Sequence, residues 1–279
     1  NLSLHSGNVL ATAAALSGTN LSLSGDAGIA LAHDVTATGT LALTAVNSAI
    51  VQSAGALAVT GTSSVNAGSG AITLDGAGNH FGQAVSLTGG TTAITDSGAL
   101  ALGTLATGNL TATSHGAQDL GSGTVTGTLA ATSNGGAITQ STSNPLTVTG
   151  TSTLNAGSGA ITLTTSGNDF GQAVSLTGGN TSITDSGALT FGTLATGNLS
   201  ATSAGALHLG SGTVTGTLSA TSNGGAITQS TSNPLTVTGI STLNAGTGAI
   251  TLTTNGNDFG QAVGLTGGST QITDSNALT

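Results

Sequence analysis

The amino-acid sequence predicts an all-β fold, a right-handed parallel β-helix of about 12–13 coils with roughly 19–25 residues in each coil. Three observations predict it. The sequence repeats itself every 89 residues, and each repeat contains four shorter segments. Apolar residues alternate with Ser and Thr in short runs that end at Gly, Asn or Ser, which is typical of strands. No segment carries apolar residues at the spacing of a helix face.

The 89-residue repeat is clearest between residues 110–198 and 199–279, where about 69 of the 81 shared residues are identical. A looser copy occupies residues 21–109, and residues 1–20 are interpreted as the end of a preceding repeat. We therefore expect residues 1–279 to form one continuous β-helix. Because this array is cut within a repeat at both ends, we expect it to belong to a longer polypeptide.

Each repeat divides into four shorter segments that open with a Leu or Val step. These steps begin at Leu2, Leu21, Leu41, Val65, Leu87, Leu110, Leu129, Leu154, Leu176, Leu199, Leu218, Leu243 and Leu265. From Leu110 the starts are 19, 25, 22 and 23 residues apart, and the same steps begin again at Leu199. One short segment cannot bury its own apolar face, so we expect each to form one coil stacked on the last. Thirteen coils rising about 4.8 Å each would give a rod of roughly 60 Å.

The strands within a coil are predicted from period-two alternation. In the coil that begins at Leu154, Leu154 and Ala156 share one face, and residues 157–159 form a turn. Ile161 and Leu163 then point inward while the Thr residues between and after them point outward. We expect each coil to contain two or three such strands around a narrow aliphatic core.

The few aromatic residues predict plugs in this core. Phe81, Phe170 and Phe259 occur once per repeat in the motif N-[HD]-F-G-Q-A-V, so about four coils separate them and they cannot stack on one another. We expect each to fill a locally wide turn. Phe191 is different, because Leu102 occupies its equivalent position in the first repeat.

The composition excludes several functions. Charged residues make up 3% of the chain, there is no Lys or Arg, and the net charge is −9. Without basic residues the chain cannot neutralise phosphates, so we expect neither a nucleic-acid partner nor binding to anionic lipid. No apolar run approaches the roughly 20 residues of a membrane span, so we expect no membrane insertion. The absence of Cys excludes disulfides and thiolate metal sites and fits an exported protein. Disorder, the alternative for such a Gly- and Ser-rich chain, is opposed by the alternating apolar residues.

One carboxylate per repeat invites a catalytic interpretation, which we reject. Asp96, Asp185 and Asp274 stand in the motif I-T-D-S. Copies about four coils apart lie farther from one another than the roughly 5–10 Å of paired glycosidase carboxylates. A polysaccharide lyase would also need a basic residue. We expect each Asp to accept hydrogen bonds from turn amides, and we expect no enzyme activity and no cofactor.

Metal binding is also not expected. A Ca²⁺ ion needs six to eight oxygen ligands, and the I-T-D-S site offers one carboxylate per repeat. The histidines occupy positions that are not equivalent between repeats, as outward turn residues would. They are His5, His33, His80, His115 and His208.

Two repeated polar patterns remain. Asn20, Asn109 and Asn198 each begin an N-x-[ST] sequon in register, and two interpretations stand for them, glycosylation and an ordinary turn role. T-x-T pairs, for example at residues 147–149 and 162–164, are typical of ice-binding β-helices. Here the pairs are expected to drift between faces, which disfavours that function.

One family resemblance covers essentially the whole chain. The succession of N-D-F-G-Q-A-V-S-L-T-G-G, I-T-D-S-G-A-L, G-N-L-x-A-T-S and G-A-I-T-Q resembles the filamentous-haemagglutinin type of large exported adhesin. The resemblance implies a β-helical shaft, secreted or at the outer surface of a Gram-negative bacterium, that provides reach and adhesion. It implies no catalytic residue.

We therefore expect a structural shaft whose partners are flanking repeats of the same polypeptide and, through an adhesive role, a glycan or protein receptor. The alternative is a filament subunit that joins like molecules end to end or side by side through open β-helix ends. A carbohydrate-active enzyme and an ice-binding protein are remote alternatives.

Overall fold

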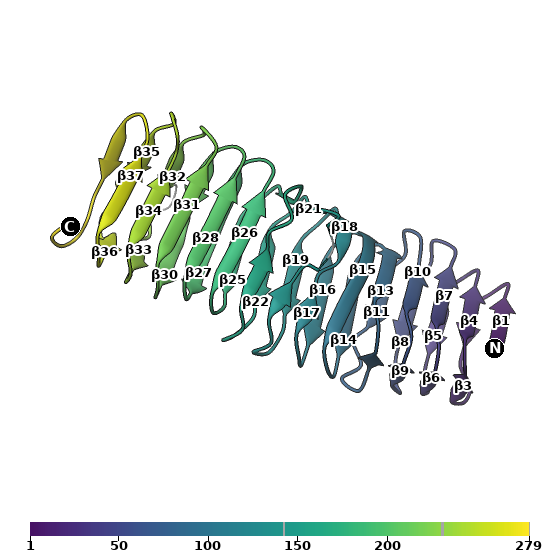
Figure 1. Cartoon of the computed structure of the whole chain (residues 1–279). Coiled ribbons are helices and arrows are strands. Elements are labelled where there is room, and N and C mark those ends of the chain that lie inside the picture. The colour runs from purple at the N-terminus through teal and green to yellow at the C-terminus, as the bar shows by residue number, and fades with distance from the viewer. Residues whose placement is uncertain (142, 230–231, 279) are drawn as a thin grey trace. The chain divides into compact units, whose positions relative to one another are not determined.

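The computed structural model describes residues 1–141, 143–229 and 232–278, and within these residues the chain forms strands and no helix. It divides into two compact units, Asn1–Gly136 and Ala137–Thr279. Each unit is a β-solenoid in which a strand pairs in parallel with the strands one coil before and after it (Figure 1). The chain makes about 13 coils in all. The predicted all-β fold with stacked parallel coils is confirmed. Ser230, Thr231 and Thr279 of the predicted third repeat lie outside the described residues.

Unit 1 has three faces, and successive strands of one coil occupy them in turn. The first face holds β1 (Leu2–Ser6), β4 (Leu21–Gly25), β7 (Leu41–Ala45), β10 (Ser63–Asn66), β13 (Val85–Gly89), most of β15 (Leu100–Thr107) and β18 (Ser122–Val125). The second holds β2 (Leu10–Ala11), β5 (Ile29–Leu31), β8 (Ile50–Gln52), β11 (Ile72–Leu74), β14 (Thr92–Asp96), β16 (Leu110–Ser114) and β19 (Leu129–Thr132). The third holds β3 (Leu16–Gly18), β6 (Val35–Ala37), β9 (Leu57–Val59), β12 (His80–Phe81), the start of β15, and β17 (Gln118–Asp119).

Unit 2 is built in the same way. Its first face holds β20 (Ile138–Thr139), β23 (Ile161–Leu163), β26 (Thr181–Asp185), β28 (Leu199–Ser203), β31 (Leu218–Ser222), β34 (Ser241–Asn244) and β37 (Val263–Thr266). The second holds β21 (Leu146–Val148), β24 (Asp169–Phe170), the start of β27 (Leu189–Thr196), β29 (Leu207–Leu209), β32 (Ile227–Gln229), β35 (Ile250–Leu252) and β38 (Thr270–Ile272). The third holds β22 (Ser152–Asn155), β25 (Val174–Thr177), the rest of β27, β30 (Ser211–Val214), β33 (Leu235–Val237) and β36 (Asp258–Phe259).

The core consists of aliphatic side chains stacked directly above one another. Ile29, Ile50 and Ile72 pair in register on the second face of unit 1, and each is at most 2% exposed. Alternate residues point outward, as the period-two pattern predicts. Fully burying one such side chain stabilises the fold by about 1.5–3 kcal/mol, so each coil gains stability only when a neighbour covers it.

The relation between repeat and coil differs from the prediction. The predicted step from Leu87 to Leu110 is not one coil, because Leu87 pairs with Leu105 and Leu110 pairs with Thr92 on the second face. The step from Leu218 to Leu243 is also shorter than predicted, since Leu218 pairs with Ser241. The 89-residue repeat therefore advances the chain by four coils and one further face.

Unit 2 follows the same rule. Ser152 and Ser241 occupy the same position in successive repeats, 89 residues apart. Ser152 pairs with Val174 on the third face, whereas Ser241 pairs with Val263 on the first face. Equivalent residues of successive repeats thus face different directions within one unit.

The phenylalanines lie fully inside the core. Phe81 pairs with Val59 and Phe170 with Val148, and both rings are 1% exposed. Phe259 is buried to the same extent. Phe191 is 2% exposed and pairs with Val174, next to a shift in the register between β25 and β27. Each ring therefore packs on aliphatic side chains of the coil below.

Replacing Phe191 with Leu, the residue at the equivalent position 102, is expected to lower the free energy of unfolding of unit 2 by about 1 kcal/mol, because the remaining space is only partly refilled. Urea unfolding followed by circular dichroism measures the change. The reciprocal Leu102→Phe variant overpacks a site shaped for Leu and is expected to cost about 1–3 kcal/mol. If neither variant changed the urea concentration at the midpoint of unfolding, the space at each site would not be specific for the side chain that occupies it.

Candidate functional site

The most strongly organised polar groups of the protein lie inside the coils, at the motif N-[HD]-F-G-Q. Its asparagine is 0% exposed in every repeat, at Asn79, Asn168 and Asn257. The Oδ1 atom of each accepts the main-chain N–H of a leucine 22 residues earlier, over 2.9 Å. The side chain therefore satisfies a buried amide of the preceding coil, which would otherwise lack a partner.

A glutamine one coil earlier completes this arrangement. The Nδ2 atom of Asn79 donates to Gln52 Oε1 over 2.8 Å, and Gln52 Nε2 donates back to Asn79 Oδ1 over 2.7 Å. The same pairing joins Asn257 to Gln229. Each glutamine also donates to a carbonyl in the turn that follows it, for example Gln52 to Gly55 over 2.9 Å. The side-chain amides of Asn79 and Gln52 thus connect two successive coils and also hold the turn that follows Gln52.

These glutamine and asparagine side chains were not predicted to have a role, although the sequence contains a signal for it. Gln52 follows Ile50 by two residues, and Gln229 follows Ile227 by the same interval. Period-two alternation places such a residue on the inner side of the strand. A polar residue in that place requires a buried partner.

The predicted aspartates lie one coil after the buried asparagines. Asp96 is 0% exposed, and its two oxygens accept the N–H groups of Phe81, over 2.7 Å, and Gly98, over 2.6 Å. Asp185 binds Phe170 and Gly187 in the same way. The carboxylate therefore caps its own turn and also ties it to the phenylalanine of the coil below.

The two aspartates of unit 2 lie on different faces. Asp185 lies on the first face of unit 2, whereas Asp274 follows β38 on the second face. Asp274 Oδ1 accepts the N–H of Phe259 over 3.3 Å. Each of these carboxylates therefore accepts main-chain N–H groups that hold its own coils together.

The surroundings of Asp185 change its protonation. Burial raises the pKa of the Asp185 carboxyl above its usual value of 3.8, the N–H groups of Phe170 and Gly187 oppose the rise, and the Asp169 carboxylate adds a smaller increase. In the first repeat His80 occupies the position of Asp169, and its Nδ1 atom lies 3.5 Å from Asp96 Oδ1. The first repeat thus replaces a like charge by a residue that can carry the opposite charge.

We expect Asp185 to make unit 2 more stable as the pH falls from neutral. A carboxyl whose pKa is raised in the folded protein binds its proton more tightly there than in the unfolded chain, so protonation favours folding. The gain begins as the pH falls through the raised folded pKa and is complete below 3.8. Urea unfolding at a series of pH values measures it, and the slope is expected to be smaller in Asp169→Asn. If the contribution of Asp185 to the free energy of unfolding decreased as the pH fell over this interval, the raised pKa of Asp185 would be contradicted.

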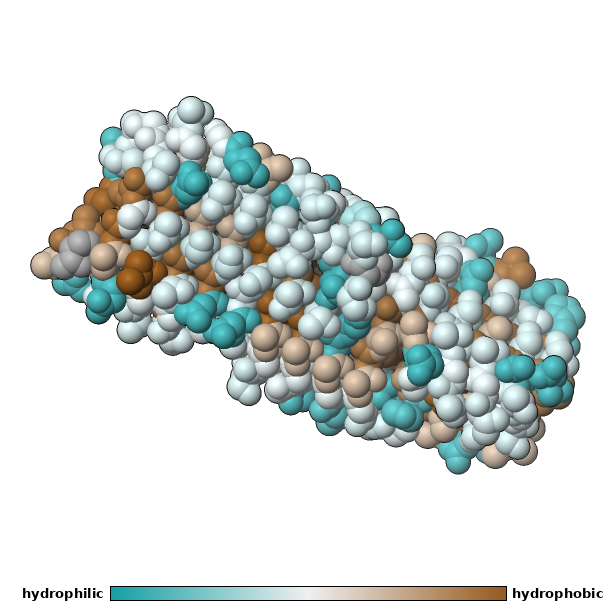
Figure 2. Space-filling view, viewed as in Figure 1, coloured by the Kyte–Doolittle hydropathy of each residue, from teal (hydrophilic) through white to brown (hydrophobic). Residues whose placement is uncertain are grey.

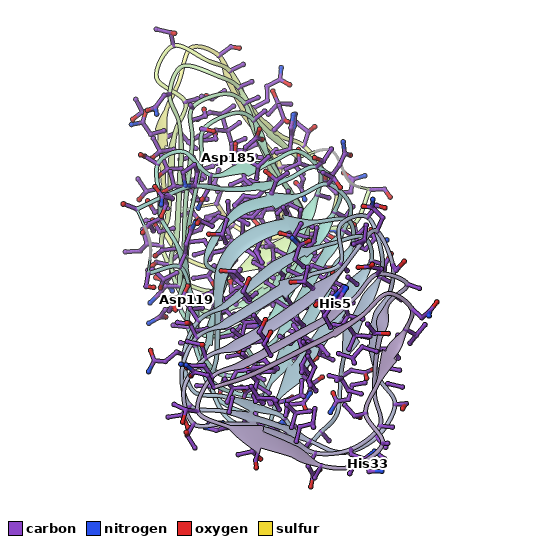
Figure 3. All side chains as sticks on the ribbon, turned by 90° about the vertical axis from the view of Figure 1, so that its right-hand side faces the viewer. His5, His33, Asp119 and Asp185 are labelled. Atoms are coloured by element: carbon purple, nitrogen blue, oxygen red, sulfur yellow. The ribbon has the colours of Figure 1, made fainter. Side chains whose placement is uncertain are left out.

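The histidines are scattered, but only His33 and His115 lie in turns as expected. The other three, His5, His80 and His208, lie in the strands β1, β12 and β29. Figure 3 shows His5, His33 and Asp119 of unit 1 at separate places on its surface. The Nε2 atom of His5 lies 3.9 Å from an Asp26 carboxylate oxygen, and both side chains are largely exposed. Within the described residues, no three His, Asp or other metal-ligating side chains come together as a metal site requires.

The sequon asparagines are parts of a ladder between coils. Oδ1 of Asn109 accepts the N–H of Thr128, over 2.9 Å, and the hydroxyl of the same residue, over 3.2 Å. Asn20 and Asn198 bind Thr40 and Thr217 in the same way. A glycine makes room for each side chain: a Cβ atom on Gly127 would lie 2.1 Å from Asn109 Oδ1. Glycosylation of these residues stays a prediction, and their carboxamides have a structural use.

The outer surface carries regular rows of hydroxyl groups. On the first face of unit 2, successive coils place Ser and Thr residues above one another in two rows. One row contains Ser182, Ser200, Ser219 and Thr242, and the other contains Thr184, Thr202 and Thr221. The hydroxyl groups on this face are therefore more regular than expected, because the T-x-T pairs were expected to drift between faces. Figure 2 shows that the visible surface is mostly of intermediate hydropathy, as Ser, Thr and Gly give.

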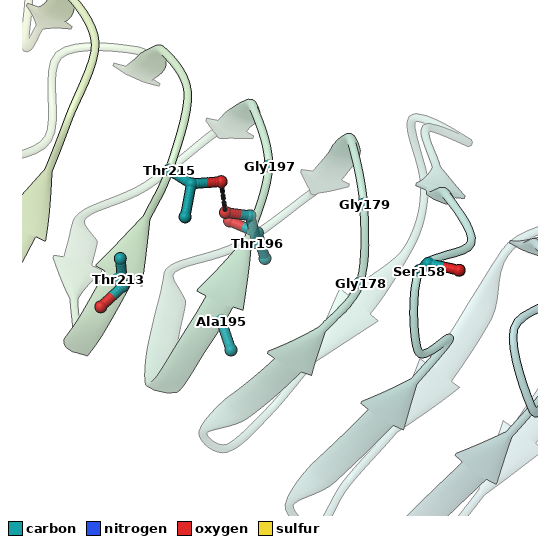
Figure 4. Close-up of a pocket in the computed structure, with 8 residues that line it drawn as sticks. All are labelled: Ser158, Gly178, Gly179, Ala195, Thr196, Gly197, Thr213 and Thr215. Carbon is teal, nitrogen blue, oxygen red and sulfur yellow. Dashed lines mark hydrogen bonds between the residues drawn. The ribbon is translucent and has the colours of Figure 1, made fainter.

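Two grooves occupy equivalent positions in the two units. The groove of unit 2 has a volume of about 390 Å³ and is lined by Ser158, Gly178, Gly179, Ala195, Thr196, Gly197, Thr213 and Thr215 (Figure 4). The groove of unit 1, of about 380 Å³, is lined by the residues 89 positions earlier. Neither lining contains a charged or aromatic side chain, and the Thr215 hydroxyl already donates to the Thr196 carbonyl over 3.1 Å. The grooves therefore offer no group that could act as an acid, a base or a nucleophile activator.

Comparison with known proteins identifies the repeat. The chain matches the family model described as "Repeats of unknown function (DUF5649)" over residues 18–88, 107–177, 178–208 and 196–266, which is well over half of its length. Three of these matches start at residues 18, 107 and 196, so successive starts are 89 residues apart. The chain belongs to this repeat family. No curated protein and no solved structure matches it. The described residues of this family member contain no helix suited to crossing a membrane.

Proposed function

We propose that this DUF5649 repeat segment is part of the shaft of a large secreted or surface-exposed bacterial adhesin, where it provides reach. The observation that carries the proposal is the use of its recurrent polar side chains. Asn168, Gln140 and Asp185 bind main-chain groups or one another between coils. A repeat whose recurrent polar side chains bond neighbouring coils to one another serves to extend a scaffold.

The surface supports the proposed location outside the cell. A chain with 3% charged residues and no Lys or Arg presents hydroxyl and amide groups to solvent, and it contains no cysteine that oxidation could alter. The resemblance to filamentous-haemagglutinin adhesins favours the outer surface of a Gram-negative bacterium.

Flanking repeats are the proposed partners of each coil. Val174 and Leu176 of β25 are at most 1% exposed, because the next coil covers them. Each coil of this kind therefore depends on its neighbours to bury its apolar side chains.

The filament alternative assigns that covering coil to a second molecule. Sedimentation of the purified segment over a concentration series separates the two: a constant monomer mass supports the shaft, and a mass that grows with concentration supports the filament. The general ground for this alternative is that an end coil of parallel strands presents main-chain N–H and C=O groups that another strand can pair with.

Cell-surface labelling tests the proposed location. Antibodies against unit 2 are expected to label intact cells that produce the full polypeptide. Trypsin applied to those cells is expected to leave the segment uncut, because it contains no Lys or Arg, whereas a protease of broad specificity should remove the label. Labelling that appears only after the cells are permeabilised would contradict the proposal.

A further inference from the structure

Three Asn–Gly dipeptides occur in the chain, at residues 134–135, 223–224 and 255–256. In such a pair the main-chain nitrogen of glycine can attack the side-chain carbonyl carbon of asparagine, because glycine has no side chain to obstruct the approach. The structure distinguishes the three sites by what holds the two reacting groups.

The first two sites are restrained. The Nδ2 atom of Asn134 donates to the Ser114 carbonyl over 3.1 Å, which holds the carboxamide away from its own backbone. At the second site the N–H of Gly224 donates to the Ser222 carbonyl over 2.6 Å, so the attacking nitrogen is occupied.

The third site lacks both restraints. Asn255 and Gly256 are exposed, and among the described residues neither the Asn255 carboxamide nor the Gly256 N–H takes part in a hydrogen bond. Gly256 has a φ of +86°, which favours glycine, and the turn is closed by the Asn257 N–H donating to Thr254 over 3.3 Å. We propose that Asn255 is a site of spontaneous covalent modification that converts it to aspartate and isoaspartate.

The reaction needs only water. The Gly256 nitrogen forms a bond to the Asn255 Cγ atom, and Nδ2 leaves as ammonia together with the amide proton, which produces a cyclic imide. Water then adds to either ring carbonyl and breaks one of its two C–N bonds. Opening on one side gives aspartate, and opening on the other gives isoaspartate, in which the backbone runs through the side chain and is longer by one methylene group.

The longer backbone affects the hydrogen-bonded pair formed by Asn257 and Gln229. Asn257, two residues after Asn255, accepts the Leu235 N–H over 2.9 Å and is paired with Gln229 over 2.7 Å. Isoaspartate at 255 displaces the turn that delivers Asn257 and so weakens the hydrogen bond to Leu235. Modification at an exposed turn thereby loosens the stacking of the last coils.

The repeats supply a matched control. Ser166 and Ala77 occupy the position of Asn255 in the other two repeats, in turns closed by the same bond. Asn255→Ser therefore keeps the turn and removes the reactive carboxamide.

The test is to incubate the folded chain in mildly alkaline buffer, digest it with pepsin and locate isoaspartate by mass spectrometry and by enzymatic methylation. We expect residue 255 to be converted first, roughly fivefold faster than residue 134 or 223, which is the effect of one ordinary net hydrogen bond. In denaturant the three sites are expected to react at similar rates.

Hydrogen exchange at the Leu235 amide provides the second readout. It is expected to accelerate in aged protein and to stay unchanged in aged Asn255→Ser. Conversion that begins at residue 134 or 223 in the folded chain would overturn the proposal, and so would unchanged Leu235 exchange in fully converted protein.

Discussion

Replacing Asn168 with Ala is expected to lower the free energy of unfolding of unit 2 by about 2–4 kcal/mol. The variant leaves the buried N–H of Leu146 without an acceptor and removes the partner of Gln140. A buried donor without a partner costs its full desolvation penalty, and the truncated side chain also leaves a cavity. Urea unfolding followed by circular dichroism measures the loss.

Asn155→Ala is the matched control. Asn155 is exposed, and its Oδ1 atom accepts a local bond from the Gly157 N–H over 2.9 Å and no other among the residues that the structure describes. Its removal is expected to cost about 0.5 kcal/mol. Because solenoid stability is a sum over neighbouring coils, hydrogen exchange in the early coils of unit 1 should not change in Asn168→Ala. Equal losses in the two variants would show that the buried asparagine has no special role.

Replacing Gly212 with Ala is expected to destabilise unit 2 by about 3 kcal/mol or more. Gly212 has a φ of +115°, and a Cβ atom there would lie 2.2 Å from the main-chain oxygen of Leu194 in the adjacent coil. Neither the strained backbone nor the overlap with a carbonyl can be relieved by a side-chain rotation. Gly123 repeats both features in unit 1. Thermal and urea unfolding both report the loss.

Gly264 provides the contrast within the same unit. The nearest atom to a Cβ built on Gly264 is 3.9 Å away, and Ser175 and Ser86 occupy its position in the other repeats. Gly264→Ser is expected to change stability by no more than about 0.5 kcal/mol. A large loss in Gly264→Ser, or none in Gly212→Ala, would contradict the close approach of coils at residue 212.

The sequence predicted the stacked coils because the longer strands carry the same alternation of apolar and polar residues. That uniformity also explains the error at Leu110. Leu87, Leu105 and Leu110 all open similar apolar runs, so the pattern cannot show which of them stacks on which. β15 passes from the third face to the first as one eight-residue strand, with the single residue Gly103 at the change of face, and the register shift between Val85 and Leu87 adjusts the pairing.

The buried pairs of asparagine and glutamine, such as Asn79 with Gln52, were harder to predict for a different reason. Asn79 stands among Gly and His residues of a turn, and turn asparagines are usually exposed. Its burial follows from the coil above, where Asp96 binds Phe81, and from Gln52 in the coil below. Asp96 and Gln52 are 17 and 27 residues away from Asn79 in the sequence, and only the stacking of the coils brings them near it.

Cysteine pairs test the central claim, that one repeat advances the chain by four coils and one face. The chain has no native cysteine, so two introduced thiols can form only one disulfide within a molecule. Ala93 and Thr111 pair in register on adjacent strands and both point outward, within the roughly 4.4–6.8 Å between Cα atoms that a disulfide needs. The account predicts rapid cross-linking of the Ala93→Cys/Thr111→Cys variant and none in Thr88→Cys/Thr111→Cys. Cross-linking of residues 88 and 111 instead would place Leu110 above Leu87 and contradict it.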